Sequence, residues 1–165
     1  MTRVIAAEPL TREGFAAFGD VIDARGGESY PINRGRAQRF DDLASIEFLG
    51  EGARPLISVV SSETTALPLA VSWMERHPLG SQAFIPMQER QLLVTVAPPG
   101  ELLRAETVRA FVTDGRQGIN YHTGTWHAVL AVLDEPGHFA VVDRGGPGDN
   151  CEERDLDESV EVRPG

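Results

Sequence analysis

The chain has 165 residues, of which 41% are hydrophobic and 24% charged, and its formal net charge is −10. This length fits a single folded domain, residues 1–165, while the acidic balance argues against nucleic acid or an anionic membrane as a partner. No apolar run is long enough to cross a bilayer or to act as a signal segment, and one cysteine, Cys151, excludes an internal disulfide and favours a reducing, cytoplasmic compartment.

The first part of the chain predicts a strand and one helix. A short strand is expected at residues 3–6, followed by a helix over Thr11–Phe18 that Thr11 caps and Gly19 ends. Phe15 and Phe18 fall on one face of this helix, so they are expected to pack against a sheet.

From residue 21 onward, short β-like segments alternate with turns rich in Gly, Pro, Asp and Ser. Many short strands with one clear helix indicate an antiparallel sandwich or barrel. The acidic segment 152–161 is expected to be a solvated terminus. The predicted strands lie at 21–22, 30–33, 38–40, 45–48, 56–61, 69–75, 83–85, 92–97, 109–112, 128–133 and 138–142.

Residues 118–127 concentrate the side chains that could form a site. The segment is predicted to be a Gly-rich turn between two strands, where a β scaffold usually presents functional groups. A histidine or tryptophan in a β protein is often only a core residue, but so many hydrogen-bonding groups in one stretch each need a partner if buried, which favours a site. Its polar and aromatic members are Asn120, Tyr121, His122, Trp126 and His127.

A second cluster precedes it in the chain. If residues 69–77 are extended, Glu75 and His77 point to the same side, with Gln82 returning on the next strand. A carboxylate beside an imidazole can bind a divalent metal or share acid–base work. A surface ion pair with Arg76 explains the same spacing, and the spacing does not decide between them.

Together the two clusters resemble the two motifs of cupins, which are small metal-binding β-barrels. Glu75-x-His77 followed by Gln82 is similar to the first motif, and residues 122–127, HTGTWH, to the second. Cupins usually have His at the place of Glu75 and Glu at the place of Gln82, so a weaker metal cradle is implied and a tightly held iron is not expected. The resemblance implies an all-β fold: a cupin-like antiparallel β-barrel (double-stranded β-helix) with a short N-terminal helix.

Longer blocks resemble the ureidoglycolate lyase family, formerly called ureidoglycolate hydrolases. They are residues 75–87, 118–127 and 143–151, with weaker likeness at 18–22 and 32–35. The resemblance implies an enzyme that cleaves (S)-ureidoglycolate to glyoxylate and urea in allantoin degradation, a carbon–nitrogen lyase of the amidine-lyase type. It also implies a homodimer and a divalent metal, usually nickel. The alternatives are a metal-dependent cupin isomerase or oxygenase acting on another small oxoacid, and a non-catalytic binder of acidic metabolites.

The implied chemistry needs groups that move protons near neutral pH, and imidazoles do so. His127, His77 and Glu75 are therefore predicted to be catalytic residues or metal ligands, with Gln82 as a further metal ligand. His122 is a second catalytic candidate that the sequence does not rank against His127.

Further candidates would bind the substrate. Asn120, Tyr121 and Gln82 can hydrogen-bond a ureido group. Trp126 is also predicted to bind the substrate. The substrate carboxylate favours an arginine, for which Arg144 is the first candidate. The alternative for Arg144, a pair with Asp143 or Asp149, stays open. Arg39 and Asn33 rank lower, and His138 is expected to be structural.

Overall fold

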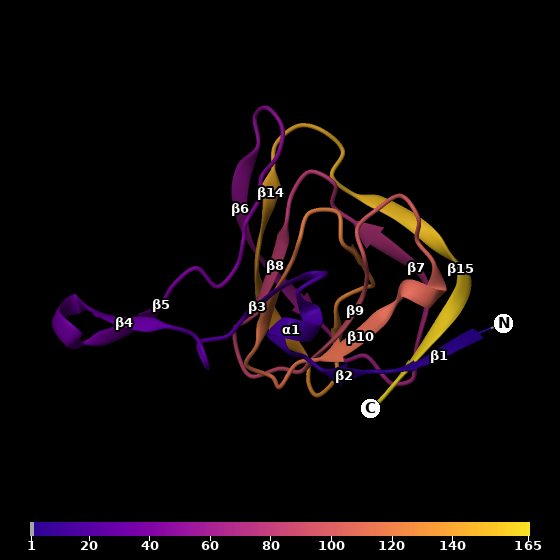
Figure 1. Ribbon diagram of the computed structural model, residues 1–165, viewed down its shortest axis with the longest axis horizontal. Helices are drawn as coiled ribbons and strands as arrows, with labels where there is room; N and C mark the ends of the chain where they lie inside the picture. The colour runs from indigo at the N-terminus through magenta and orange to yellow at the C-terminus, as the bar shows by residue number, and fades with distance from the viewer. Residues whose placement is uncertain (1) are drawn as a thin grey trace.

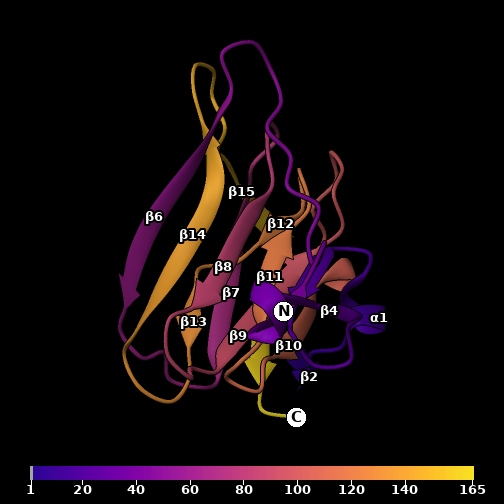
Figure 2. The same ribbon diagram turned by 90° about the vertical axis from the view of Figure 1, so that its left-hand side faces the viewer.

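A computed structural model describes residues 2–165, and nearly all of its regular structure is β (Figures 1 and 2). Two larger sheets face each other as a nearly closed barrel, and a two-stranded hairpin stands apart from them. The predicted all-β, barrel-like fold is therefore confirmed. Within residues 2–165, no helix has the length and apolar character needed to cross a bilayer.

Sheet A has eight strands in the order β1-β15-β7-β12-β9-β10-β2, with β13 also paired to β9. Its outer strand pairs β1–β15 and β10–β2 are parallel, and its other pairs are antiparallel. Its strands are β1 (Thr2–Ala6), β2 (Glu8–Pro9), β7 (Leu69–Arg76), β9 (Leu92–Ala97), β10 (Arg109–Val112), β12 (Trp126–His127), β13 (Ala131–Val132) and β15 (Glu152–Arg163).

Sheet B has five antiparallel strands in the order β3-β11-β8-β14-β6. They are β3 (Gly19–Ile22), β6 (Arg54–Ser62), β8 (Gln82–Pro86), β11 (Gly118–Tyr121) and β14 (Gly137–Gly145). The remaining elements are the helix α1 (Arg12–Phe15), the 3₁₀ turns η1 (Asn33–Gly35) and η2 (Ala105–Thr107), and the hairpin strands β4 (Ser29–Ile32) and β5 (Ala37–Phe40).

The α-helix α1 is shorter than predicted. It ends at Phe15 rather than Phe18, although Thr11 caps it as expected by accepting a hydrogen bond from the Gly14 backbone N–H (3.0 Å). Phe15 and Phe18 are both buried in the core between the sheets, with ring centroids 6.0 Å apart. Packing of these two rings sets the chain path here, and it overrides the helical pattern.

Two strand predictions and the prediction for the acidic tail were wrong. Residues 45–48 form no strand apart from an isolated bridge at Phe48, and of residues 128–133 only β13 is a strand. The acidic tail is not a solvated terminus but the twelve-residue strand β15, in which Val160 and Val162 are fully buried. Along β15, charged residues alternate with side chains that point inward. This alternation with a period of two residues is typical of a strand, but the acidic composition of the segment concealed it.

The strand β9 separates two hydrophobic cores, and all six of its residues are buried. One core lies between the two sheets and includes Phe15, Phe139 and Tyr121. The other lies on the opposite face of sheet A, where Trp126 and Met74 are fully buried.

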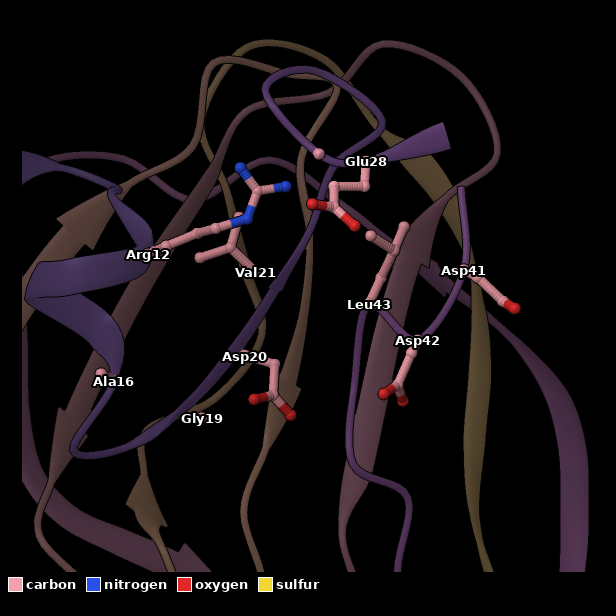
Figure 3. A pocket seen from close by; sticks show the side chains of 10 residues that line it. Arg12, Ala16, Gly19, Asp20, Val21, Glu28, Asp41, Asp42 and Leu43 are labelled. Carbon is pink, nitrogen blue, oxygen red and sulfur yellow. The ribbon is translucent and has the colours of Figure 1, made fainter. Parts of the chain in front are cut away.

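The β4–β5 hairpin extends away from the barrel (Figure 1). A hollow of about 370 Å³ lies at its base, on the outer side of sheet B. Figure 3 shows the carboxylates around this hollow, which belong to Asp20, Glu28, Asp41 and Asp42.

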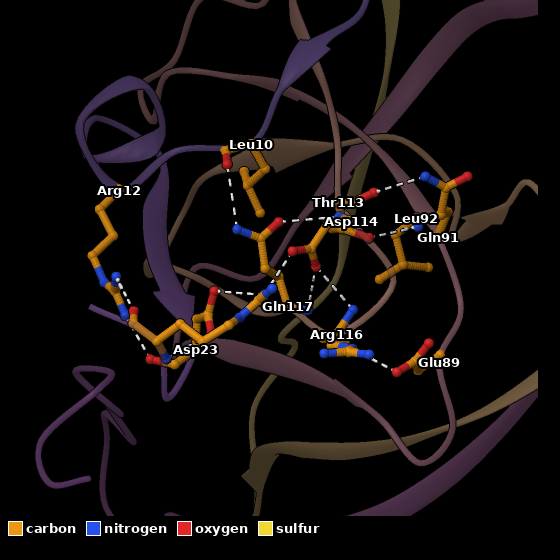
Figure 4. A network of polar contacts seen from close by, with 11 residues as sticks. Leu10, Arg12, Asp23, Glu89, Gln91, Leu92, Thr113, Asp114, Arg116 and Gln117 are labelled. Carbon is orange, nitrogen blue, oxygen red and sulfur yellow. Dashed lines mark hydrogen bonds and ion pairs between the residues drawn. The ribbon is translucent and has the colours of Figure 1, made fainter. Parts of the chain in front are cut away.

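A hydrogen-bond network fixes the turn between β10 and β11 (Figure 4). The Thr113 hydroxyl accepts a hydrogen bond from the Leu92 backbone N–H (2.9 Å), and the Asp114 carboxylate accepts one from the Arg116 backbone N–H (3.0 Å). The side chain of Gln117 donates to the Leu10 carbonyl (3.4 Å). The turn that leads into β11 is thereby tied to β9 of sheet A and to the segment before α1.

Candidate active site

Three strands, β7, β12 and β11, bring a group of polar side chains together at one end of the core between the sheets. Glu75 on β7 and His127 on β12 are directly opposite each other in the ladder, so their side chains point to the same side of sheet A. His77 follows two residues after Glu75 and shares its side. Tyr121 reaches the same space from β11 of sheet B, and its ring stacks on that of His127 (centroids 4.3 Å apart, 12° between planes).

One carboxylate oxygen faces both imidazoles. The Oε1 atom of Glu75 lies 3.3 Å from His127 Nε2 and 3.9 Å from His77 Nε2. The two imidazole rings are 5.1 Å apart between centroids. The other oxygen, Oε2, lies 3.9 Å from the Cys151 thiol sulfur.

Backbone carbonyls orient both imidazoles. His127 Nδ1 lies 3.1 Å from the Thr125 carbonyl oxygen, and His77 Nδ1 lies 2.6 Å from that of Asn150. A carbonyl only accepts hydrogen bonds, so each Nδ1 carries a proton and donates. In the neutral rings, both Nε2 lone pairs then point toward Glu75.

The residues of the cluster fit a divalent metal ion. One carboxylate oxygen and two imidazole nitrogens lie within 4.8 Å of one another. His127 Nε2 is buried and has no hydrogen-bond partner, as expected for a nitrogen that serves as a ligand. A backbone carbonyl that accepts a hydrogen bond from the opposite nitrogen of the ring is usual for metal-binding histidines. The amide oxygen of Gln82, 3.2 Å from His77 Nε2, is a fourth possible ligand atom nearby.

A small cavity opens beside the cluster. Its volume is about 140 Å³, which suits a small molecule, and it is partly open. Polar groups line one part of the cavity and apolar side chains line the rest. A small number of polar groups would therefore orient a ligand, and the apolar side chains would exclude water from it. The lining residues are Val60, Glu75, Gln82, Phe84, Tyr121, His127, Ala128 and Leu130.

The cavity is not the largest in the molecule, since larger hollows lie at the base of the β4–β5 hairpin and beside the C-terminus. We assign the site by its chemistry, because only this cavity of the three is lined by an imidazole, that of His127, next to the carboxylate of Glu75.

In the cavity, the Glu75 side chain is an ionised carboxylate and the neighbouring Tyr121 side chain is a neutral phenol. The close approach of His127 Nε2 holds the pKa of Glu75 below its ordinary value, against the opposing effect of burial. Burial, reinforced by the negative charge of Glu75, raises the pKa of Tyr121 far above its ordinary value. At neutral pH the site therefore contains a proton acceptor and a proton donor side by side.

The depressed pKa of Glu75 predicts a pH dependence of stability. A carboxyl group whose pKa is lower in the folded state stabilises the fold above its ordinary pKa, and this contribution is lost as the pH falls through the folded value. Denaturant unfolding between pH 7 and pH 3 should therefore show wild type losing more stability than Glu75→Gln below the ordinary value of 4.5. Parallel curves for the two proteins would contradict the assignment.

A tight turn joins the parts of the site. The Gly124 backbone N–H donates to the His77 carbonyl (2.9 Å), and Gly124 has a φ of +78°, which favours glycine. The Thr125 hydroxyl donates to the Phe18 carbonyl (2.8 Å). This turn covers residues 122–125 only, because the predicted turn segment begins with the strand β11.

The structure places other predicted residues away from the cavity. Asn120 and His122 point to the outer side of sheet B, where the Asn120 amide donates to Asp20 (3.0 Å) and His122 Nε2 lies 3.0 Å from the same carboxylate. Burial alone would raise the pKa of Asp20, but these hydrogen bonds and the one from the Ser45 backbone N–H lower it. They form a second polar cluster, separated from the cavity by sheet B.

Trp126 and Arg144 also lie outside the cavity. Trp126 is on the opposite side of β12 from His127, where the Arg76 guanidinium lies 4.7 Å from its ring centroid. The Arg144 guanidinium is buried and donates to the backbone carbonyls of Leu49 and Pro147 (2.7 Å each). Neither acidic neighbour considered from the sequence is its partner in these contacts.

The lower-ranked candidates are farther away. Asn33 and Arg39 belong to the β4–β5 hairpin, and Arg39 pairs with Asp41 (2.9 Å). His138 is exposed on β14.

Sequence reasoning missed Asp143 as a residue of the interior. Its Oδ2 atom accepts a hydrogen bond from the Gln82 amide (3.3 Å), and its Oδ1 atom is buried without a partner. The signal was present in the alternation along β14, since Asp143 follows the inward Val141 by two residues. This hydrogen bond also shows which way the Gln82 amide points, with its oxygen toward His77.

Comparison with known proteins places this geometry in context. A family model described as ureidoglycolate lyase matches residues 2–163. The chain is 51% identical over 162 residues to a ureidoglycolate lyase of Mesorhizobium japonicum, which covers 98% of each protein. It is 50% identical over 158 residues to one of Burkholderia mallei, covering 96% of this chain and 92% of the relative. A ureidoglycolate lyase of Chelativorans sp. is 49% identical over 160 residues, covering 97% and 96%.

Proposed function

The chain belongs to the ureidoglycolate lyase family, and on that premise we propose that the cluster of Glu75, His77 and His127 is where it splits ureidoglycolate into glyoxylate and urea. The observation that carries the proposal is the convergence of both Nε2 atoms on one carboxylate oxygen beside a small cavity. The reaction class is elimination across a carbon–nitrogen bond, which needs one group to accept the hydroxyl proton and another to protonate the departing urea nitrogen.

Glu75, His77 and His127 are the residues that would hold a divalent metal ion, with nickel as the candidate from the family resemblance and Gln82 nearby. When bound there, such an ion would act as a Lewis acid that favours ionisation of a substrate hydroxyl and stabilises developing negative charge on oxygen. The carbonyls of Thr125 and Asn150 keep both Nε2 atoms directed at this position.

The free oxygen of Glu75 is our candidate for the proton acceptor. Oε1 is directed at the imidazoles, which leaves Oε2 to take the hydroxyl proton as the carbonyl of glyoxylate forms. The electron pair of the breaking bond moves to the urea nitrogen. The hydroxyl of Tyr121, kept protonated by its raised pKa, can supply the proton that this nitrogen gains. Transfer from Glu75 back to the phenolate restores both groups.

The other cavity residues orient the substrate and limit the access of water. Gln82 is fixed by Asp143, so it offers an oriented amide to a polar ligand. The side chains of Val60, Phe84 and Leu130 form an apolar wall.

We assign Arg144 a positioning role instead of contact with the substrate carboxylate. Its guanidinium holds the Pro147 carbonyl, three residues before Asn150, whose own carbonyl orients His77. The contacts of Arg144 therefore reach the site through the loop that follows β14.

Release of urea from ureidoglycolate by the purified protein tests the proposal. We expect urea and glyoxylate in equal amounts, and a bound divalent metal detected by elemental analysis that is lost in a His77→Ala, His127→Ala double variant. An oxoacid turned over without urea would instead identify the isomerase or oxygenase alternative. Binding of ureidoglycolate without turnover, in the metal-loaded protein, would identify a non-catalytic binder.

A further inference from the structure

The side chains of Gln82 and Asp143 meet on the inner side of sheet B. Val141 is opposite Phe84 in the ladder between β14 and β8, and both are buried in the core between the sheets. Gln82 and Asp143 each lie two residues from one member of this pair, so the alternation along a strand places them on the same inner side. The Gln82 amide N–H donates a hydrogen bond to Asp143 Oδ2 (3.3 Å). Asp143 thus holds one end of the Gln82 amide.

The other end of this amide points to His77. The Gln82 Oε1 atom lies 3.2 Å from His77 Nε2. His77 Nδ1 donates to the Asn150 carbonyl (2.6 Å), so in the neutral ring Nε2 carries a lone pair and no hydrogen. The amide oxygen also has only lone pairs to offer. Two acceptors therefore face each other, and neither receives a hydrogen bond from this contact.

A second pair of acceptors has the same arrangement. His127 Nδ1 donates to the Thr125 carbonyl (3.1 Å), so the lone pair of its Nε2 atom faces Glu75 Oε1 at 3.3 Å. This Nε2 atom is buried, and it has no hydrogen-bond partner within residues 2–165. Imidazole nitrogens and carboxyl or amide oxygens are all ligands of divalent cations. One such cation among Nε2 of His77 and His127 and Oε1 of Glu75 and Gln82 relieves both pairs.

An amide has two different ends, and Asp143 determines which end of Gln82 faces the cluster. If the amide were turned around, its N–H would donate to His77 Nε2, and the cluster would lose one oxygen ligand. The amide oxygen would then face Asp143 Oδ2, which as a carboxylate oxygen has no hydrogen to donate. Asp143 therefore favours the orientation in which the oxygen points to His77.

The guanidinium next to Asp143 in the chain does not neutralise this carboxylate. Arg144 donates instead to the backbone carbonyls of Leu49 and Pro147 (2.7 Å each). The Oδ1 atom of Asp143 is buried and has no hydrogen-bond partner in the described part of the chain. A hydrogen bond to a charged acceptor is stronger than one to a neutral acceptor, and it polarises the donor amide. The contact with Asp143 therefore also increases the electron density on Gln82 Oε1, which makes this oxygen a better ligand.

We propose that Asp143 is a positioning residue for the metal site. It holds the Gln82 amide so that Oε1, and not the N–H group, is directed at the divalent ion. The inference rests on the metal site of the proposed function, and it adds Asp143 to the residues that determine metal affinity.

The affinity of the metal-free protein for Ni²⁺, measured by competition with a chelating indicator, tests this role. Asp143→Asn keeps the shape of the side chain, but an amide can donate or accept and so allows both orientations of Gln82. The Ni²⁺ dissociation constant should rise between about tenfold and a hundredfold, as is usual when a group that hydrogen-bonds a metal ligand is lost. An unchanged constant, or a wild type that binds no divalent ion, would overturn the proposal.

The matched control is Asp149→Asn. It removes the same charge from the loop that follows β14, but Asp149 is exposed. Its Ni²⁺ dissociation constant should stay within about twofold of wild type, as is usual for a surface change. A loss as large as that of Asp143→Asn would show that any nearby negative charge supports metal binding, and the specific role of Asp143 would be refuted.

A carboxylate at position 82 separates the orientation of the side chain from the charge of Asp143. The two oxygens of a carboxylate are equivalent, so the Gln82→Glu variant needs no partner to orient it. Adding Asp143→Asn to Gln82→Glu should therefore strengthen Ni²⁺ binding, because it removes the repulsion between two facing carboxylates and supplies an N–H donor. The same substitution thus has opposite effects in the two backgrounds. Equal losses in both backgrounds would show that Asp143 acts through its charge and does not orient the amide.

These affinities are measured without substrate, so their outcome is independent of the urea-release assay. A protein that releases urea and binds Ni²⁺, but is insensitive to Asp143→Asn, would refute this inference and leave the proposed function intact. A protein with the expected pattern of Ni²⁺ affinities that releases no urea would refute the proposed function alone.

Discussion

Replacing His127 with alanine is expected to lower the rate of urea release on the order of a hundredfold or more, as for the loss of a group that acts directly in the chemistry. The imidazole is buried, stacked on Tyr121 and directed at Glu75 by the Thr125 carbonyl, and it is the imidazole nearer to the Glu75 carboxylate. Steady-state urea release by wild type and variant at saturating substrate gives the comparison.

The control for this substitution is His138→Ala. His138 is exposed on β14 and outside the cavity, so its turnover should equal that of wild type. Circular dichroism should confirm that the His127→Ala barrel is folded, because the change leaves a space against Tyr121. Wild-type turnover in a folded His127→Ala protein would mean that the imidazole is only part of the scaffold.

Glu75→Gln should have a comparable or larger effect, between about a hundredfold and ten-thousandfold, because the amide keeps the shape of the carboxylate and cannot accept a proton at neutral pH. The change also removes the negative charge that faces both imidazoles. Single-turnover and steady-state rates across pH 5 to 9 would measure it.

The comparison substitution for Glu75 is Glu153→Gln, an exposed residue on β15 directly opposite it in the ladder. This variant alters the charge near the site without altering the cavity, so its turnover should stay within about twofold of wild type, as is usual for a surface change. Equal losses in both variants would indicate a general electrostatic effect rather than proton transfer by Glu75.

Local patterns were sufficient to predict the elements that carry the site. Period-two alternation placed Glu75 and His77 on one side of a strand, and the structure has them on one side of β7. The close approach of Tyr121 to His127 depends on two strands from different sheets, and spacing in the sequence does not encode such a contact.

Prediction from the sequence failed where adjacent residues of one strand have their side chains on opposite faces of the sheet. Asn120 and Tyr121 are neighbours, yet sheet B separates their side chains, because alternate residues of a strand face opposite ways. Treating residues 118–127 as one turn concealed this alternation. The position of Arg144 outside the cavity has the same cause, since only its neighbour Asp143 faces Gln82 in the interior.

The position of β15 determines when this protein can fold during its synthesis. β15 follows all other strands of residues 2–165 in the chain, yet it pairs with β7 on one side and with β1 on the other. Sheet A therefore has a gap next to β7 until β15 has been synthesised, and β1 has no partner before then. A chain that stops before Glu152 leaves β7 with an unpaired edge, which favours aggregation.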